Sequence, residues 1–401
     1  MTDGGGGDVV VTGVGVASAS AIGGRQELAA APMARPTPLD ALERALPVEM
    51  AFQVPGTMSR LLKPYLKQRK SLKLMSRDAR LAVLAAAHAL TDAGLDPQAR
   101  DRWATAPEEV GLYMGVGLEP GDVSEVGQAL AVARIDQEAR VDLARLGQEG
   151  IDRIPPLAAL KTLPNMALAH VAINFDLMGP GEALSCWSTA GLHALAAAHE
   201  AIERGLCQVA LVGAADSDVD FDGLALLIRA GLLTTPLRAD PTGARDLWHA
   251  GPGWIPGEGA AFVVLESLEH AQARGVSPVA RMVGTTNVML PPRSPGIMAP
   301  EGVRRALAPL LSDRPCRVAS AAGHAMGWRQ AEAVGVEAAR AEAAGLAELV
   351  FPGRGHGYCG CATALLDLVS LLGSSDEGDV AVVGWGPTGE YAAARLSREV
   401  R

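Results

Sequence analysis

The sequence predicts an α/β protein in which one helix–strand unit occurs twice. The first copy is an Ala/Leu-rich helix over residues 191–205, followed by the apolar strand Gln-Val-Ala-Leu-Val-Gly at 208–213. The second copy is a similar helix over 361–372, followed by Asp-Val-Ala-Val-Val-Gly at 379–384. Both strands are apolar along their whole length, which is typical of a sheet covered by helices on both faces. This self-similarity indicates a duplicated α/β unit.

The two halves are expected to meet where a charged helical segment runs into a turn, over residues 269–278. We therefore predict an N-terminal half over residues 1–270 and a C-terminal half over residues 271–401. A chain of 401 residues is long enough to bury a large core.

Composition excludes several classes of function. The formal net charge of −10 argues against a general nucleic-acid binder. No apolar run reaches the roughly 18 residues of a membrane span, and the N-terminus lacks a basic region followed by an apolar core. We therefore expect a cytoplasmic protein with no membrane partner. The five cysteines are too scattered for a disulfide framework and fit no common zinc spacing, so no metal site is expected.

The most informative stretch covers residues 179–191, Gly-Pro-Gly-Glu-Ala-Leu-Ser-Cys-Trp-Ser-Thr-Ala-Gly. Its first three residues predict a tight turn, a short strand follows, and Ser188 stands where the long helix opens. A hydroxyl at a sharp strand-to-helix turn is the arrangement of a nucleophile elbow, beside a helix N-terminus that favours negative charge. The alternative is that the hydroxyl only caps the helix.

Seven segments fall in the order found in one protein family: residues 9–15, 77–94, 165–179, 191–192, 213–216, 257–271 and 384–386. The most specific is Gly-Glu-Gly-Ala at 257–260. Over nearly its whole length the chain resembles the β-ketoacyl synthases, the decarboxylative condensing enzymes of fatty-acid and polyketide synthesis. The resemblance implies a thiolase-like fold, two pseudo-repeated α/β halves in a layered αβαβα arrangement, usually dimeric.

The resemblance also implies candidate catalytic residues. The family uses a cysteine that accepts an acyl group and two histidines that assist decarboxylation of a malonyl unit. Anchored on Gly191, the nucleophile position falls on Ser188, so the chain is a divergent member with serine in place of cysteine. The second histidine corresponds to His356, although Phe351 stands where the family has a lysine.

The first histidine belongs to a motif that is degraded here. We prefer the register that places it at His324, since this register keeps Gly327 and puts Glu332 where the family has an aspartate. The competing register puts Ala322 at that position and leaves the group absent. Each histidine has a structural alternative, as a hydrogen-bonded core residue without a catalytic role.

A serine at the nucleophile position changes the chemistry. A thiol titrates near 8.5 and can become a thiolate, whereas a hydroxyl needs a general base in contact with it; His356 or His324 could serve. An acyl oxyester is a poorer donor than a thioester, so efficient elongation by this chain alone is not expected. By the resemblance, the oxyanion would lie between the N–H groups of Ser188 and Trp385, with Trp385 and Gly386 forming the gate loop.

Two functions follow from these assignments. In the first, the chain is an acyltransferase that takes an acyl group from acyl carrier protein or coenzyme A onto Ser188. In the second, it is a catalytically silent, chain-length-factor-like partner of an active ketosynthase. Both imply acyl carrier protein as a partner, an acyl donor carried on phosphopantetheine or coenzyme A with no bound cofactor, and a homodimer or a heterodimer with a ketosynthase. A thiolase-fold protein without acyl chemistry remains a third class.

A basic segment over residues 59–73 stands out in this acidic chain. Its lysines Lys63, Lys67 and Lys70 are the candidate docking surface for an acidic carrier protein. The alternative is an ordinary solvated face of the protein.

Overall fold

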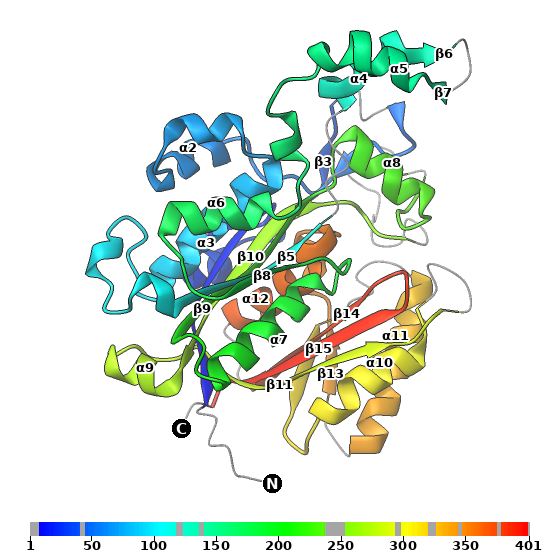
Figure 1. The fold of residues 1–401 in the computed structure, drawn as a ribbon. Coiled ribbons are helices and arrows are strands. Elements are labelled where there is room, and N and C mark those ends of the chain that lie inside the picture. Colours follow the sequence, from blue (N-terminus) through cyan, green and yellow to red (C-terminus); the bar gives the residue numbers. More distant parts are fainter. Residues whose placement is uncertain are drawn as a thin grey trace.

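A computed structural model describes residues 8–40, 45–117, 123–135, 140–235, 237, 253–292, 298–319, 326–343, 347–374 and 378–399. Within these residues, 11 strands form one mixed sheet in the order β13-β12-β14-β15-β11-β1-β10-β9-β5-β8, with β2 paired to β1 (Figure 1). The sheet is joined at its centre by a short antiparallel contact of two residue pairs between β1 and β11. It therefore consists of two five-stranded halves that meet along a narrow seam, with β2 added to one of them.

The first half of the sheet is formed by β1 (Val9–Ser18), β10 (Glu258–Ser267), β9 (Val209–Ser217), β5 (Val110–Val116) and β8 (Gly181–Leu184). Strand β10 runs antiparallel to β1 and β9, whereas β5 is parallel to both β9 and β8. Strands β1, β5, β9 and β10 are buried almost throughout, which explains their continuous apolar sequences.

The second half is formed by β11 (Ala280–Met289), β15 (Glu390–Ser397), β14 (Asp379–Trp385), β12 (Cys316–Ala319) and β13 (Ala347–Val350). Strand β15 is antiparallel to β11 and to β14, and β12 is parallel to β14 and β13. All of these strands follow residue 271, and all strands of the first half precede it. The division at 270 and 271 itself stays a prediction.

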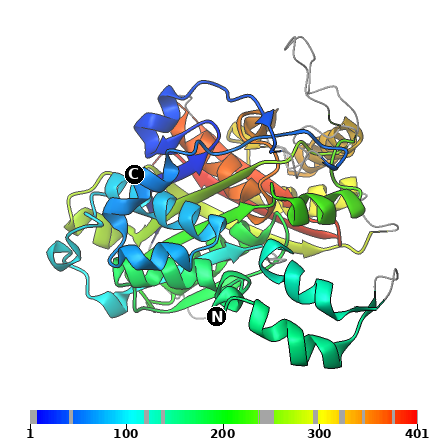
Figure 2. The same ribbon diagram turned by 90° about the horizontal axis from the view of Figure 1, so that it is seen from above.

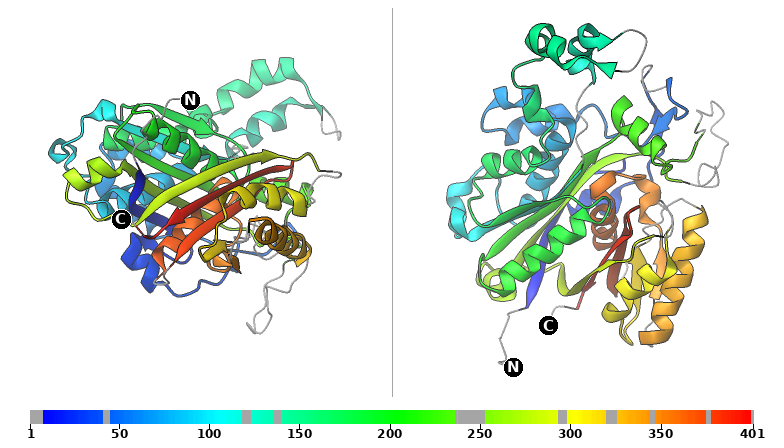
Figure 3. Two further views of the ribbon diagram at one scale, coloured as in Figure 1. Left: turned by 90° about the horizontal axis from the view of Figure 1, so that it is seen from below. Right: turned by 45° about the vertical axis from the view of Figure 1, so that its right-hand side comes forward.

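Helices cover both outer faces and fill the space between the two halves of the sheet. One outer layer contains α3 (Arg77–Asp92) and α6 (Met166–Phe175), and the other contains α10 (Pro300–Leu307) and α11 (Met326–Ala343). Between them lie α7 (Ala190–Glu203) and α12 (Thr363–Gly373), which pack on each other and on strands of both halves (Figure 3). This is the αβαβα arrangement of the thiolase-like fold, as the sequence predicts.

The duplicated unit of the sequence is visible in this middle layer. Helix α7 precedes β9 in the first half, and α12 precedes β14 in the second. Their apolar faces share one core cluster with the inner faces of the strands. Two further clusters lie under α3 and around α10 and α11. The Ala/Leu-rich composition of α7 and α12 follows from this burial, because both helices are covered on nearly all sides.

The remaining described elements are short and lie around this body. The helices are α1 (Arg25–Ala30), α2 (Met58–Leu62), α4 (Val123–Ala133), α5 (Leu143–Arg145), α8 (Phe221–Arg229) and α9 (Leu268–Ala273). The strands are β2 (Ile22–Gly23), β3 (Thr37–Pro38), β4 (Met50–Ala51), β6 (Arg134–Ile135) and β7 (Arg140–Val141). Elements α4 to α5 form an arm that projects from the body (Figures 1 and 2).

In the described chain, none of the helices has the length and the apolar character needed to cross a membrane.

Candidate functional site

Ser188 lies in the turn between β8 and α7, as the elbow prediction requires. Thr189 is the N-cap residue of α7, but its side chain accepts no backbone N–H of the helix; its hydroxyl donates instead to the carbonyl oxygen of Cys186 at 2.7 Å. Trp187, directly before Ser188, has a φ angle of 44°, in the left-handed region that a bulky side chain rarely adopts. Strained residues of this kind are concentrated at functional sites, which directs attention to this turn.

The Ser188 hydroxyl is buried, and it donates its hydrogen bond to the backbone carbonyl oxygen of Trp385 at the end of β14. The next amide, Gly386 N–H, donates to the Glu390 carbonyl oxygen at 2.9 Å. The gate loop therefore meets Ser188 through an acceptor oxygen, whereas an oxyanion needs N–H donors. The oxyanion role of Trp385 and Gly386 stays a prediction.

His356 is buried and engaged on both ring nitrogens. Its Nδ1–H donates to the Gly357 carbonyl oxygen at 2.9 Å, and its Nε2 lies 3.1 Å from Oδ1 of Asp367. Burial raises the pKa of the Asp367 carboxyl, and the hydrogen bond from His356 opposes this rise. Within the described residues, no hydrogen bond joins His356 to Ser188.

The first histidine cannot be placed, since His324 and its competitor Ala322 both lie outside the described residues. Glu332, the acidic residue that favours the His324 register, is buried on α11. The catalytic assignments of Ser188, His356 and His324 therefore remain predictions. Of these three residues, the structure locates Ser188 and His356.

A stack of buried aromatic rings lies next to the Ser188–Trp385 contact. The Trp254 and Tyr358 rings are parallel within 5°, with centroids 3.9 Å apart. The Trp385 ring is tilted relative to the Trp254 ring, and the centroids of these two rings are 5.6 Å apart. All three side chains are at most 2% exposed. These rings fill the interior, and Tyr358 extends the stack to the wall of a pocket.

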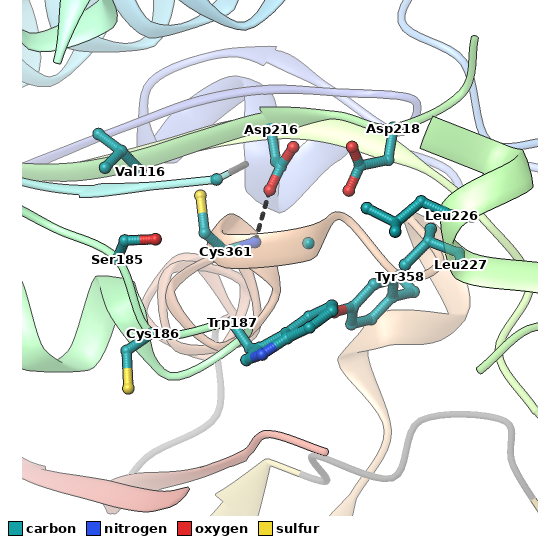
Figure 4. A pocket seen from close by; sticks show the side chains of 12 residues that line it. Val116, Ser185, Cys186, Trp187, Asp216, Asp218, Leu226, Leu227, Tyr358 and Cys361 are labelled. Atoms are coloured by element: carbon teal, nitrogen blue, oxygen red, sulfur yellow. Dashed lines mark hydrogen bonds between the residues drawn. The ribbon is translucent and has the colours of Figure 1, made fainter. Parts of the chain in front are cut away.

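The pocket lies beside the turn that carries Ser188 (Figure 4). It is formed by the C-terminal ends of β5 and β9, the turn residues Ser185 to Trp187, helix α8, and the segment from Tyr358 to Cys361. Its volume is about 130 Å³, well below the several hundred Å³ of a typical small-molecule site. Ser188 is not among the lining residues, because its side chain points to Trp385 instead.

Two carboxyl groups at the end of β9 line this pocket. Asp216 accepts hydrogen bonds from the N–H groups of Cys361 and Ser217, at 2.8 and 2.9 Å. Burial raises the pKa of Asp216 to about 6, and these donors limit the rise. Burial, and then the charge of Asp216, raise the pKa of Asp218 well above its usual range.

In the sequence, Asp216 is marked only as part of the family match, and neither Asp218 nor Tyr358 is predicted as a site residue. Two carboxylates in an i, i+2 relation at the end of a buried strand are the signal that points to Asp216 and Asp218. No local signal marks Tyr358, since its place depends on a bridge to Pro256, far away along the chain.

The lysines of the predicted docking surface lie between α2 and α3: Lys63 and Lys70 on the short 3-10 turns Lys63–Tyr65 and Arg69–Lys73, and Lys67 on the bend between them. All three are exposed. Lys67 forms an ion pair with Asp176, and its backbone N–H donates to Asn174 at 2.9 Å. Docking of a carrier protein on this surface stays a prediction.

Among the described residues, no group of three or more His, Cys, Asp or Glu side chains is arranged to hold a metal ion.

The layered fold, with its two α/β halves, is that of the thiolase-like proteins. The sequence model of the β-ketoacyl synthase N-terminal domain matches residues 7–271. The chain belongs to the β-ketoacyl synthase family.

Relatives and solved structures agree with this assignment. Nodulation protein E of Rhizobium leguminosarum bv. trifolii is 33% identical over 222 residues, 54% of this chain and 47% of that protein. The 3-oxoacyl-[acyl-carrier-protein] synthase 2 of Staphylococcus aureus is 26% identical over 216 residues, 54% of this chain and 48% of that protein. The matched regions thus span about half the length of these relatives.

A solved structure titled as the ishigamide ketosynthase/chain length factor superposes with a TM-score of 0.75 at 21% identity, covering 98% of this chain and 100% of that one. At this identity, the likeness supports the fold alone.

Proposed function

We propose that this chain is a ketosynthase-like subunit of a fatty-acid or polyketide-type pathway that does not elongate an acyl chain by itself and works beside an active ketosynthase. One observation carries the proposal: the Ser188 hydroxyl donates its hydrogen bond to the Trp385 carbonyl oxygen, and within the described residues no hydrogen bond joins it to a basic side chain. A serine without a contacting base is a poor nucleophile.

The small pocket and the buried aromatic stack support the same conclusion. The pocket beside the elbow is small, about 130 Å³, and the rings of Trp254, Tyr358 and Trp385 occupy the neighbouring interior. The name of one structural neighbour pairs a ketosynthase with a chain length factor, and that of one relative refers to acyl carrier protein. We accordingly propose an active ketosynthase as the dimer partner and acyl carrier protein, with its phosphopantetheine arm, as the carrier of the acyl group.

A second candidate function is acyl acceptance by Ser188, with the group delivered from acyl carrier protein or coenzyme A. The turn geometry favours it, since Ser188 sits at the start of α7 next to the strained Trp187. Reaction would need a rotation of the hydroxyl away from Trp385 and a contacting base, which the described part of the chain does not supply.

Intact-protein mass separates the two candidates. Wild type and Ser188→Ala are incubated with a panel of acyl carrier thioesters of different chain lengths. We expect no stable mass increase in either protein. An acyl adduct on wild type that is absent from Ser188→Ala would reject the silent role and establish Ser188 as an acceptor.

Co-expression tests the partner role directly. We expect a stable complex with an active ketosynthase and elongation only when both chains are present, unchanged by Ser188→Ala. Elongation by the purified chain alone would contradict the proposal.

A further inference from the structure

The residue before Ser188 has a backbone conformation that its side chain disfavours. Among the described residues, Trp187 and Asp176 are the non-glycine residues with a positive φ angle, at 44° and 52°. Asp176 ends α6 as its C-cap, a place where a left-handed residue is common. Trp187 has no such explanation, and a bulky side chain in this region persists only where the surrounding structure holds it.

Hydrogen bonds on both sides of Trp187 hold the turn in this conformation. The N–H group of Thr189 donates to the Cys186 carbonyl oxygen at 3.1 Å, which closes the turn around Trp187. The Ser188 hydroxyl donates to the Trp385 carbonyl oxygen. Because these contacts fix the backbone around Trp187, they also fix the direction of its side chain, which lines the pocket beside the elbow (Figure 4).

The Trp187 indole is half-buried and lies against apolar neighbours. It lines the pocket together with Leu226, Leu227 and Tyr358 (Figure 4). It also packs against the apolar cluster around α10 and α11, to which Leu227, Tyr358 and Trp385 belong. The indole therefore occupies space next to the elbow that an apolar group attached at the elbow would need.

Removing the indole would enlarge the pocket with apolar space. With the indole in place the volume is about 130 Å³, and Leu226 and Leu227 are among the other lining residues. An apolar cavity of about 150 Å³ is enough to bind benzene, and an indole ring is larger than benzene. The opened space would therefore admit a chain of about six carbon atoms. Because Asp216 and Asp218 also line the pocket, an uncharged ligand is favoured over a carboxylate.

We propose that Trp187 is a specificity-determining residue, whose indole plugs the space beside the elbow and excludes an acyl chain from it. This inference rests on the proposed function and gives it a structural cause. A subunit whose acyl space is filled can assist a ketosynthase but cannot hold a growing acyl chain itself. The strained backbone belongs to the same arrangement, since the conformation that places the indole in the pocket is one that glycine adopts freely and tryptophan does not.

Binding of neutral 1-alkanols tests the plug, with calorimetry and ligand-observed NMR on 1-butanol, 1-hexanol and 1-octanol. We expect Trp187→Gly to bind 1-hexanol about tenfold more tightly than wild type or better, since burial of about two methylene groups already gives that factor. Affinity should stop rising beyond about six carbon atoms, because the opened space is then full. Trp103→Gly is the matched control. Trp103 is also half-buried but packs against the cluster under α3, so this variant should not gain alcohol binding.

Thermal unfolding tests the strained turn. Trp187→Gly should melt at a higher temperature than Trp187→Ala, because glycine adopts a φ angle near 44° without strain and alanine does not. A higher melting temperature for the alanine variant would reject the strained turn on which the proposal depends. If Trp187→Gly does not fold, Trp187→Leu, which keeps a smaller apolar side chain, should bind 1-butanol where wild type does not.

Three binding results would overturn the proposal. They are equal 1-hexanol binding by wild type and Trp187→Gly, absence of saturable binding to the folded variant, and the same gain in Trp103→Gly. None of them affects the silent role, which intact-protein mass and co-expression test separately. Conversely, elongation by the purified chain alone would reject the proposed function, whereas the alcohol measurements involve no acyl transfer and would still show whether Trp187 is a plug.

Discussion

The His356 imidazole is held between the Asp367 carboxyl and the Gly357 carbonyl oxygen, at 3.1 and 2.9 Å. Asp367 is itself on α12 and almost completely buried. Because both of its ring nitrogens are hydrogen-bonded, the buried His356 side chain holds its own segment in place. That segment includes Tyr358, which lines the pocket. At the scale of the residue, these contacts support the structural alternative for His356.

A double-mutant cycle tests this role. His356→Ala and Asp367→Asn should each lower the free energy of unfolding by about 2–4 kcal/mol, because each leaves a buried polar partner unpaired. The double variant should lose much less than the sum, since the pair is removed together. Urea unfolding followed by circular dichroism measures all three. Additive losses would show that the two side chains are not coupled.

The sequence identified Ser188 and His356 from their neighbours in the chain, and it could not tell what either side chain contacts. Both side chains contact residues that only the fold brings near. The partner of Ser188, Trp385, is 197 positions away along the chain. Asp218 and Tyr358 could not be predicted for the same reason. They line one pocket only because α8, β9 and the segment after His356 come together in the fold.

At the scale of elements, the contact of α7 with β5 fixes where Ser188 lies. A Cβ atom built on Gly115 of β5 would come within 2.5 Å of the Gly191 backbone nitrogen and 2.7 Å of the Ala190 carbonyl carbon. Both atoms belong to the first turn of α7, so any side chain at this position must push the helix away from the sheet. The absence of a side chain at Gly115 therefore sets the depth of the elbow.

Gly115→Ala should destabilise the protein by about 3 kcal/mol or more, because the obstructing atoms are backbone. Gly147→Ala is the matched control: it lies in the helical segment Leu146–Gly150, and its Cβ would meet nothing within 4 Å. This variant should be neutral or gain about 0.5–1 kcal/mol from helix propensity. Chemical denaturation of both variants measures the difference, and equal stabilities would contradict the close approach.

The sequence predicts the boundaries of some elements well and those of others poorly. The sequence places the helices of the duplicated unit well, because their apolar residues recur over many turns. The charged sequence over residues 122–145 predicts helical structure, and the short strands are not predicted: the described residues there form α4, the strand pair β6 and β7, and α5. Polar residues in this projecting arm carry too weak a pattern to show where the chain reverses.

At the scale of the whole molecule, strand β8 is a free edge of the sheet within the described chain. Its residues are mostly exposed, and Met178, a large apolar side chain shortly before it in the chain, is 63% exposed. Exposed edges with adjacent apolar surface favour association with another chain. The predicted homodimer or heterodimer would be expected to use this side of the molecule.

Met178→Asp should therefore weaken association, by about tenfold or more in dissociation constant, because a charge would be buried without a partner. Met289→Asp is the control, since Met289 is equally exposed, at 64%, but lies on β11 in the other half. Light scattering with size-exclusion chromatography measures the assembly, with the partner ketosynthase where the complex is heteromeric. The same loss in both variants would reject β8 as the interface.

The sequence by itself determined the family, the layered α/β fold with its duplicated unit, and the position of Ser188 at the elbow. These depend on local features: apolar periodicity, glycine turns, and short motifs in a fixed order. Only the tertiary structure decided that the hydroxyl faces a carbonyl oxygen, that His356 pairs with Asp367, and that Asp216, Asp218 and Tyr358 share one small pocket. Hydrogen bonding and burial are relations between distant segments, so the folded chain alone fixes them.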